Sequence, residues 1–203
     1  MASFCLLRLG APHCGHAALV ETMLEVEPGA CIVLVGSGDV VGRPDTPLRW
    51  EERRELLLAL LHARNTDTRR ISCAPLPELR TNGWDEQWCA YLLDAARGAL
   101  AASHVRHQSP EPLTRYVFGD DYEASVFAPL VELAPSLELL RVARRYDKSA
   151  RELRLAITHR DQRLLAKYRA ALDVYPEETR ARIAEVCAAG VDRPQAPSLP
   201  ASP

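Results

Sequence analysis

The sequence predicts one α/β domain built around a mostly parallel sheet. Short apolar runs alternate along the chain with longer segments of helical periodicity. The run ACIVLV at residues 30–35 is apolar without a break, as buried parallel strands are. A length of 203 residues suits a single domain of this class. Strands separated by helices pair in parallel through right-handed crossovers, and such sheets collect ligands at the carboxyl ends of their strands.

The first half of the chain supplies three of the predicted strands and two helices. A Pro-Gly pair at 28–29 ends the first helix, and a Gly-Ser-Gly turn at 36–38 follows the second strand. Four of the leucines in this half recur at helical spacing and are expected to face the core: Leu56, Leu57, Leu60 and Leu61. The predicted elements are strand 3–9, helix 15–26, strand 30–35, helix 48–63 and strand 70–74.

The second half adds two strands and ends in helices. Its predicted elements are helix 84–102, strand 114–118, helix 124–131, strand 137–142 and helices 149–157, 162–172 and 177–189. We expect one domain over residues 1–190, with a core at 3–157 and C-terminal helices at 160–189. Residues 191–203 contain four prolines and are predicted to form a disordered tail.

Composition argues against several classes of function. The formal net charge of −2 shows no basic excess, so no nucleic-acid partner is expected. No apolar run approaches the roughly 20 residues that span a bilayer, and residues 1–9 lack the features of a signal peptide, so no membrane association is expected. The six cysteines form no C-x-x-C pair, which argues against a zinc knuckle. A reducing, cytoplasmic setting fits best.

The most informative segment is RLGAPHCGH at residues 8–16, which runs from the first strand straight into a helix. A helix N-terminus offers free N–H groups and the positive end of a dipole, which suits a phosphate. His13 and His16 add donors at the same place, and Gly15 lets the backbone approach a ligand closely. The alternative is a capped helix start with two surface histidines. The position after the first strand favours the phosphate site.

This segment resembles the nucleotidyltransferases related to nicotinamide-mononucleotide adenylyltransferase. Their usual lead-in is G-R-F-Q-P-x-H-x-G-H. The sequence departs from it at Leu9, where Phe is usual, and at Ala11, where Pro is usual. The positions that match without gaps are Arg8, His13, Gly15 and His16.

Four further segments continue the resemblance in family order, over about residues 3–157. Residues 35–37 with 46–54 resemble I-G-S … N-P-F-x-x-E-E-R, and 85–88 resemble N-D-x-x-W. Residues 118–127 resemble a segment of adenylyltransferase domains that are often fused to a Nudix hydrolase, and 148–154 resemble I-S-x-T-x-I-R. No Nudix domain is expected after the last motif. The resemblance implies a Rossmann-like, three-layer α/β/α fold with C-terminal helices.

The implied activity is transfer of AMP from ATP to nicotinamide mononucleotide or nicotinate mononucleotide, with release of pyrophosphate and formation of NAD. The attacking phosphate oxygen is already an anion, so the reaction needs no general base and no covalent intermediate. Positioning and charge stabilisation at the α-phosphate then carry catalysis. Mg²⁺ would bridge phosphate oxygens, held mainly by substrate and water, so no protein metal site is expected.

The resemblance also implies roles for individual residues. His13 and His16 would hold ATP phosphates, and Arg154 would stabilise the leaving pyrophosphate, which makes these three the candidate catalytic residues. Ser37 and Trp88 would contact the acceptor, with Trp88 stacking on the pyridine ring. The candidate ATP-binding residues are Arg8, Gly10, His13, Gly15, His16, Ser149, Arg151 and Arg154.

Several of these residues have structural alternatives. Trp88 is equally well explained as a core aromatic, and Ser37 as a small residue that closes a strand. Trp84 is expected in the core, and the acidic pair at 120–121 in a solvated loop rather than at a metal. Residues 51–54 are expected to form one exposed helix face, although Arg53 matches a family position.

Arg151 is the clearest departure from the family, because Thr is usual there. Its guanidinium either joins Arg154 as a second phosphate clamp, which we favour, or points to solvent. The departures leave three alternatives open: a related enzyme with another phosphate-ester acceptor, a nucleotide-binding protein without turnover, and a scaffold that assembles through its C-terminal helices. A homo-oligomer also stays open, since relatives commonly form oligomers.

Overall fold

The computed structural model describes residues 1–79, 85–103, 112–119, 124–143 and 145–191. Its centre is a five-stranded sheet in the order β3-β2-β1-β4-β5, in which every pair of neighbouring strands is parallel. Each predicted strand is present, which confirms the parallel α/β class. The strands are β1 (Ala2–Leu7), β2 (Ala30–Gly36), β3 (Ile71–Leu76), β4 (Leu113–Gly119) and β5 (Glu138–Val142).

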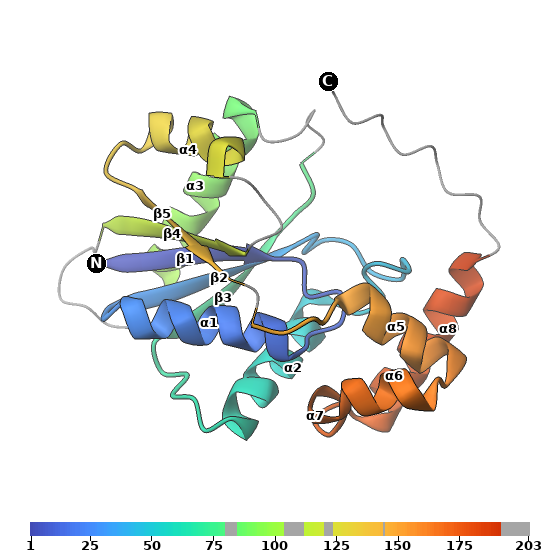
Figure 1. Cartoon of the computed structure of the whole chain (residues 1–203). Coiled ribbons are helices and arrows are strands. Elements are labelled where there is room, and N and C mark those ends of the chain that lie inside the picture. The colour runs from blue at the N-terminus through green and yellow to red at the C-terminus, as the bar shows by residue number, and fades with distance from the viewer. Residues whose placement is uncertain (80–84, 104–111, 120–123, 144, 192–203) are drawn as a thin grey trace.

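Helices cover both faces of the sheet (Figure 1). α1 (Cys14–Val26) and α2 (Trp50–Ala63) lie on one face. α3 (Glu86–Ala102) and α4 (Ala128–Leu133), which follows the 3-10 turn η1 (Ala124–Phe127), lie on the other. Alternation along β1 divides the core in the same way, because Cys5 packs with α1 and α2 whereas Phe4 packs with α3 and α4. The fold is therefore Rossmann-like, with three layers.

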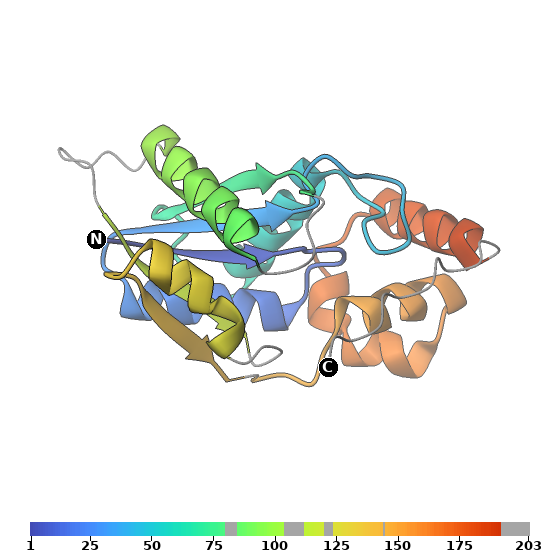
Figure 2. The same cartoon turned by 90° about the horizontal axis from the view of Figure 1, so that it is seen from above.

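Four C-terminal helices gather beyond the carboxyl ends of the strands (Figures 1 and 2). They are α5 (Ala150–His159), α6 (Gln162–Lys167), α7 (Arg169–Leu172) and α8 (Glu177–Val191). The single helix predicted over 162–172 is wrong, because the chain leaves regular helix at Tyr168, with φ −106° and ψ 14°. Tyr168, Tyr175 and Ile183 belong to the same core as α1 and α2, so these helices are packed onto the sheet domain.

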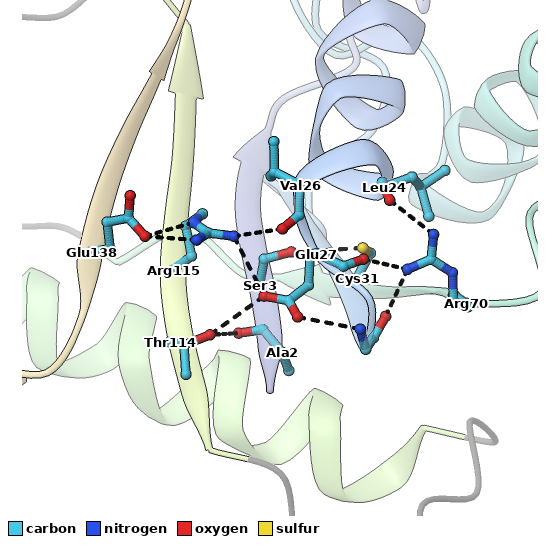
Figure 3. A network of polar contacts seen from close by, with 11 residues as sticks. Ala2, Ser3, Leu24, Val26, Glu27, Cys31, Arg70, Thr114, Arg115 and Glu138 are labelled. Atoms are coloured by element: carbon cyan, nitrogen blue, oxygen red, sulfur yellow. Dashed lines mark hydrogen bonds and ion pairs between the residues drawn. The ribbon is translucent and has the colours of Figure 1, made fainter.

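The amino-terminal edge of the sheet is closed by a polar network (Figure 3). The carboxylate of Glu27, only 1% exposed, accepts from the Gly29 N–H at 3.2 Å and lies 3.7 Å from Arg115. Arg115 also donates to the Val26 carbonyl and pairs with Glu138 at 2.7 Å. This network ties the end of α1 to β4 and β5 at the edge away from the predicted site.

Some predictions fall outside the described residues. These are Trp84 as a core residue, the acidic pair at 120–121 as a loop, and the tail from residue 192 onward.

Candidate active site

The turn between β1 and α1 is capped by its own two histidines. His13 is the N-cap of α1, and its Nδ1 accepts a hydrogen bond from the Gly15 N–H at 3.1 Å. Nδ1 of His16 accepts one from the His13 N–H at 3.2 Å, which completes a reciprocal capping box. Because each Nδ1 is an acceptor, the neutral form of each ring carries its proton on Nε2. Both Nε2–H groups are therefore donors.

Gly15 is needed for space. A Cβ at this position would lie 2.9 Å from Cε1 and 3.0 Å from Nδ1 of His13, so a larger residue would displace the capping ring. The rings of His13 and His16 lie 4.0 Å apart between centroids. No acidic residue stands in the first turn of α1, so its positive end is not neutralised by its own first turn. The whole H-x-G-H pattern thus serves one local geometry.

A second cluster lies behind the turn. A Cβ on Gly10 would fall against the carbonyl oxygen of Asp45 and 2.8 Å from Nη1 of Arg154. The neighbouring Leu9 is fully buried with φ of 52°, in the left-handed region that side chains rarely adopt. Burial lowers the pKa of the Arg154 guanidinium, which also lies close to Asp45 and Cys187. Arg154 therefore packs against the loop at Gly10.

A cavity of about 760 Å³ spans the carboxyl ends of all five strands. Its volume falls in the range of small-molecule sites, and in parallel sheets of this kind that edge is where ligands bind. Three of the predicted site residues do not line it: Gly10, Arg151 and Arg154. The predicted site residues that do line it are Arg8, His13, Gly15, His16, Ser37, Trp88 and Ser149.

Among the lining residues that sequence reasoning missed are four whose side chains could contact a polar ligand: Glu78, Arg145, Tyr146 and Lys148. Each follows the end of a strand, β3 for the first and β5 for the others. The rule that ligands collect after parallel strands was therefore a usable signal for all four.

The end of the cavity near β2 and β3 carries a carboxylate. The Ser37 hydroxyl donates to Oε1 of Glu78 at 2.8 Å, and Arg43 pairs with Oε2 at 3.2 Å. Ser37 is buried with φ of 52°. Among the described residues that line the cavity, Glu78 is the one acidic side chain. Trp88 is half-buried, packs against the core around α3 and also lines the cavity.

Arg53 corrects one sequence-based expectation. It is fully buried rather than part of an exposed helix face. Its Nη1 donates to the carbonyls of Arg8 at 2.6 Å and Gly36 at 2.9 Å, and its Nη2 donates to that of Ser37 at 2.8 Å. The forked guanidinium thereby holds the ends of β1 and β2 at a fixed spacing beside the cavity.

The other end of the cavity is built at the start of α5. Ser149 is the N-cap, and its Oγ accepts from the Glu152 N–H at 3.0 Å. The Tyr168 hydroxyl accepts from the Ser149 N–H at 2.7 Å and lies 2.5 Å from Oε2 of Glu152. Burial, followed by the Glu152 carboxylate, raises the pKa of Tyr168, which keeps this hydroxyl protonated. Arg151 is exposed to solvent.

Two features are absent from the part of the chain that the structure describes. No three His, Cys, Asp or Glu side chains there come together as a metal site would require. None of the helices there combines the length and the apolar character needed to cross a bilayer. All six cysteines are free thiols.

The fold and the cavity define a Rossmann-like α/β protein with a ligand-sized site at the carboxyl edge of its sheet. No protein-family model matches the sequence, and no curated protein matches it in sequence. Solved structures do match. A bifunctional NMN adenylyltransferase/ADP ribose pyrophosphatase from Francisella tularensis superposes with a TM-score of 0.61 and 16% identity, over 78% of this chain and 42% of that one.

A second solved structure with that description and from that organism, complexed with AMP and a manganese ion, matches with a TM-score of 0.62 and 14% identity. It covers 92% of this chain and 52% of that one. The chain thus spans about half the length of these structures. At such identities the likeness shows the fold, so the resemblance indicated by the motifs is confirmed at that level.

Proposed function

We propose that this chain transfers AMP from ATP to nicotinamide mononucleotide, releasing pyrophosphate and forming NAD. One observation carries the proposal. The two histidines of the β1–α1 turn line a cavity at the carboxyl edge of the sheet, and their capping bonds put the proton of each neutral ring on Nε2. Donors at a helix start, with Arg8, Arg145 and Lys148 around the same cavity, suit a polyphosphate. The NMN adenylyltransferase of the same fold supports this choice of reaction.

The cavity offers separate places for the two substrates. Near β4 and β5 its wall is largely apolar, with Phe118, Val142 and Ala143, which suits an adenine ring. Near β2 and β3 it carries Ser37, Glu78 and Trp88, which suits the pyridine nucleotide. The two phosphate groups would then meet at the turn between them, beside the histidines. AMP is present in one matching structure of that fold.

The proposed step is an in-line displacement. An oxygen of the acceptor phosphate forms a bond to the α-phosphorus, the bond from that phosphorus to the bridging oxygen breaks, and its electron pair leaves with pyrophosphate. The Nε2–H groups of His13 and His16 would stabilise charge at the α-phosphate. Arg154, which packs against Gly10 behind the turn, would add positive potential on the leaving-group side.

A divalent ion fits this scheme as a partner of the substrate. Glu78 is the acidic residue among the described cavity-lining residues, and it lies near β2 and β3, so no described lining residue beside the turn is a carboxylate. Mg²⁺ would be held by phosphate oxygens and water, where it would neutralise charge on the transferred and leaving phosphates. Manganese in a matching structure is consistent with a divalent ion in this role.

The acceptor is proposed to be the amide rather than the acid form of the pyridine nucleotide. The Glu78 carboxylate accepts hydrogen bonds and would accept one from a carboxamide NH₂. It would repel a nicotinate carboxylate, although Arg43 at 3.2 Å weakens that repulsion. Trp88 beside it offers a face on which the ring would stack. We place the reaction in a reducing, cytoplasmic setting, in keeping with the six free thiols.

The deciding experiment measures pyrophosphate release from ATP and Mg²⁺ with four acceptors: nicotinamide mononucleotide, nicotinate mononucleotide, phosphopantetheine and glycerol phosphate. Release with the first confirms the proposal. Release with only one of the last two indicates a related enzyme with another acceptor. ATP binding without release indicates a protein that has lost turnover, and absence of ATP binding indicates a scaffold.

A further inference from the structure

The side-chain ammonium of Lys148 lines the cavity, and no motif gives it a role. We infer that Lys148 binds the triphosphate of ATP and supplies the second phosphate-binding cation that we expected at Arg151. The inference rests on the proposed adenylyl transfer and deepens it. Lys148 stands where the family motif has Ile, so the resemblance implied no role for it.

The ammonium lies at the histidine turn. Its Nζ is 3.9 Å from Sγ of Cys14, the first residue of α1, which stands between His13 and Gly15. It also lies 5.5 Å from the ring centroid of Tyr146 and 5.7 Å from that of Tyr168. The Tyr168 ring is in turn 6.1 Å from the ring of His13. Two aromatic faces thus hold the Lys148 side chain against the place where the phosphates would lie.

The charge of Lys148 is not balanced as those of its neighbours are. Among the described cavity-lining residues, Arg8 pairs with Asp45 at 3.1 Å and Arg145 approaches Glu25 at 3.8 Å. Lys148 has no carboxylate partner in the described part of the chain, although it is half-buried.

The carboxylates nearest to Lys148 in sequence are already engaged. Asp147 and Glu152 both pair with Lys167, at 3.5 Å and 2.8 Å. Lys148 lies at the positive end of α1 and lines the same cavity as the two histidines, an arrangement that an anion would stabilise. A triphosphate carries several negative charges and would reach both the ammonium and the turn. The exposed Arg151, in contrast, does not line the cavity.

The chain provides a matched control. Lys167 lies 5.8 Å from the same Tyr168 ring, yet it is paired with carboxylates and does not line the cavity. We propose calorimetric titration of the wild type, Lys148→Met and Lys167→Met with ATP and with AMP, in Mg²⁺ at low salt. Lys148→Met should raise the Kd for ATP roughly 10- to 100-fold, as expected when one charge-assisted bond is lost. The change for AMP should be much smaller, and Lys148→Arg should restore part of the affinity.

The outcomes separate this inference from the proposed function. If the wild type binds no ATP, the proposed function fails and the inference fails with it. If the wild type binds ATP and Lys148→Met binds it as tightly as Lys167→Met does, only the inference is overturned. An equal loss in both lysine variants would also overturn it, because the effect would then be structural.

A measurement on the unaltered chain removes any dependence on folding of the variants. Acylation of lysines by an amine-reactive ester, read by peptide mass spectrometry, should be blocked at Lys148 by ATP and left unchanged at Lys167. Equal labelling of Lys148 with and without saturating ATP would contradict the assignment.

Discussion

At the scale of single residues, each histidine of the turn uses its two nitrogens for different purposes. Nδ1 caps the start of α1, and Nε2–H is the group that we propose stabilises charge on the phosphate. Removal of the whole ring would therefore lower both the stability of the fold and the rate, and the two effects could not be told apart. Substitutions that replace one nitrogen at a time separate the two.

His16→Asn tests the Nε2 role directly. The Asn side-chain oxygen can stand near the place of Nδ1 and accept from the His13 N–H, whereas nothing replaces Nε2. We expect the melting temperature to stay near that of the wild type, while kcat falls on the order of 10²- to 10³-fold. His16→Ala should lose both the cap and the rate. A His16→Asn enzyme with near-normal kcat would remove His16 from the mechanism.

Glu78→Gln tests the proposed choice of acceptor. The substitution removes the negative charge but keeps an oxygen to accept from Ser37. It should improve kcat/KM for nicotinate mononucleotide relative to the amide by roughly 5- to 50-fold, a range typical of a like-charge contact at a partly exposed site. The ATP Michaelis constant should not change. An unaltered ratio of the two kcat/KM values would show that Glu78 does not discriminate between the carboxamide and the carboxylate.

At the scale of elements, the C-terminal helices act on the site through hydroxyl groups. The Tyr175 hydroxyl, between α7 and α8, donates to the Pro12 carbonyl at 2.7 Å, directly before the histidine turn. The Tyr168 hydroxyl accepts from the N–H of Ser149, at the start of α5. These helices thus position the cavity wall at two points, which is a role that their sequence did not indicate.

Tyr175→Phe should reveal this positioning. The Pro12 carbonyl is left buried without its partner, which costs about 1–2 kcal/mol of stability and frees the turn. We expect kcat to fall several-fold with little change in the KM for the acceptor. Thr22→Val is the control, because it removes one hydroxyl bond inside α1, to the Ala18 carbonyl, far along the helix from the turn. Equal kcat losses in both variants would contradict the positioning role.

The contact between α1 and the end of α2 predicts a pH dependence. Arg64 donates to both carboxylate oxygens of Glu21 at 2.7 Å, and this hydrogen bonding is the main cause that lowers the pKa of Glu21. Because the pKa of Glu21 is lower in the folded chain, its ionised form stabilises the fold. This stability is fully present above the pKa of the unfolded chain, about 4.3, and is lost as the pH falls through the pKa of the folded chain.

Glu21→Gln should therefore reduce the free energy of unfolding by about 1 kcal/mol at pH 7, since the pair is partly exposed. The deficit relative to the wild type should shrink below about pH 4, as urea unfolding at several pH values would show. Glu55→Gln, which alters a longer and more exposed pair with Arg54, should give little difference at any pH. A Glu21→Gln deficit of the same size at pH 3 and pH 7 would disprove the linkage.

At the scale of the whole molecule, the sheet has one edge that is built for stability and one that holds the cavity. The network around Glu27 and Arg115 closes the amino-terminal edge, while the turn and the C-terminal helices surround the other (Figures 2 and 3). Substitutions at the two edges should therefore have different consequences.

Glu27→Ala is the test at this scale. It leaves Arg115 and the Gly29 N–H without a buried partner and should cost about 3 kcal/mol, or roughly 6–12 °C in Tm. The KM values for ATP and acceptor should match the wild type at temperatures where the variant is folded. A change in either KM of several-fold would mean that the two edges are coupled.

The sequence by itself determined the order of elements and the place of the turn. Both follow from short-range chemistry: the unbroken apolar run of β2 must be buried, and a His-x-Gly-His segment after a strand caps a helix with its own rings. The need for glycine at position 15 could also be predicted, because the side chain that it must leave room for, His13, lies only two residues earlier in the chain. The spacing of apolar residues, with a period of two in strands and 3.6 in helices, indicates the type of each element from its own residues alone.

Only the tertiary structure decided which charged side chains reach the cavity. Arg53 looked like part of an exposed helix face, yet three carbonyl groups from the ends of β1 and β2 draw it into the interior. Arg151, which we expected to clamp phosphate, is exposed to solvent, whereas Lys148, which stands where the family motif has Ile, lies at the turn. The direction of a long charged side chain depends on partners from distant elements, and those partners are brought near it only when the sheet and the C-terminal helices have packed together.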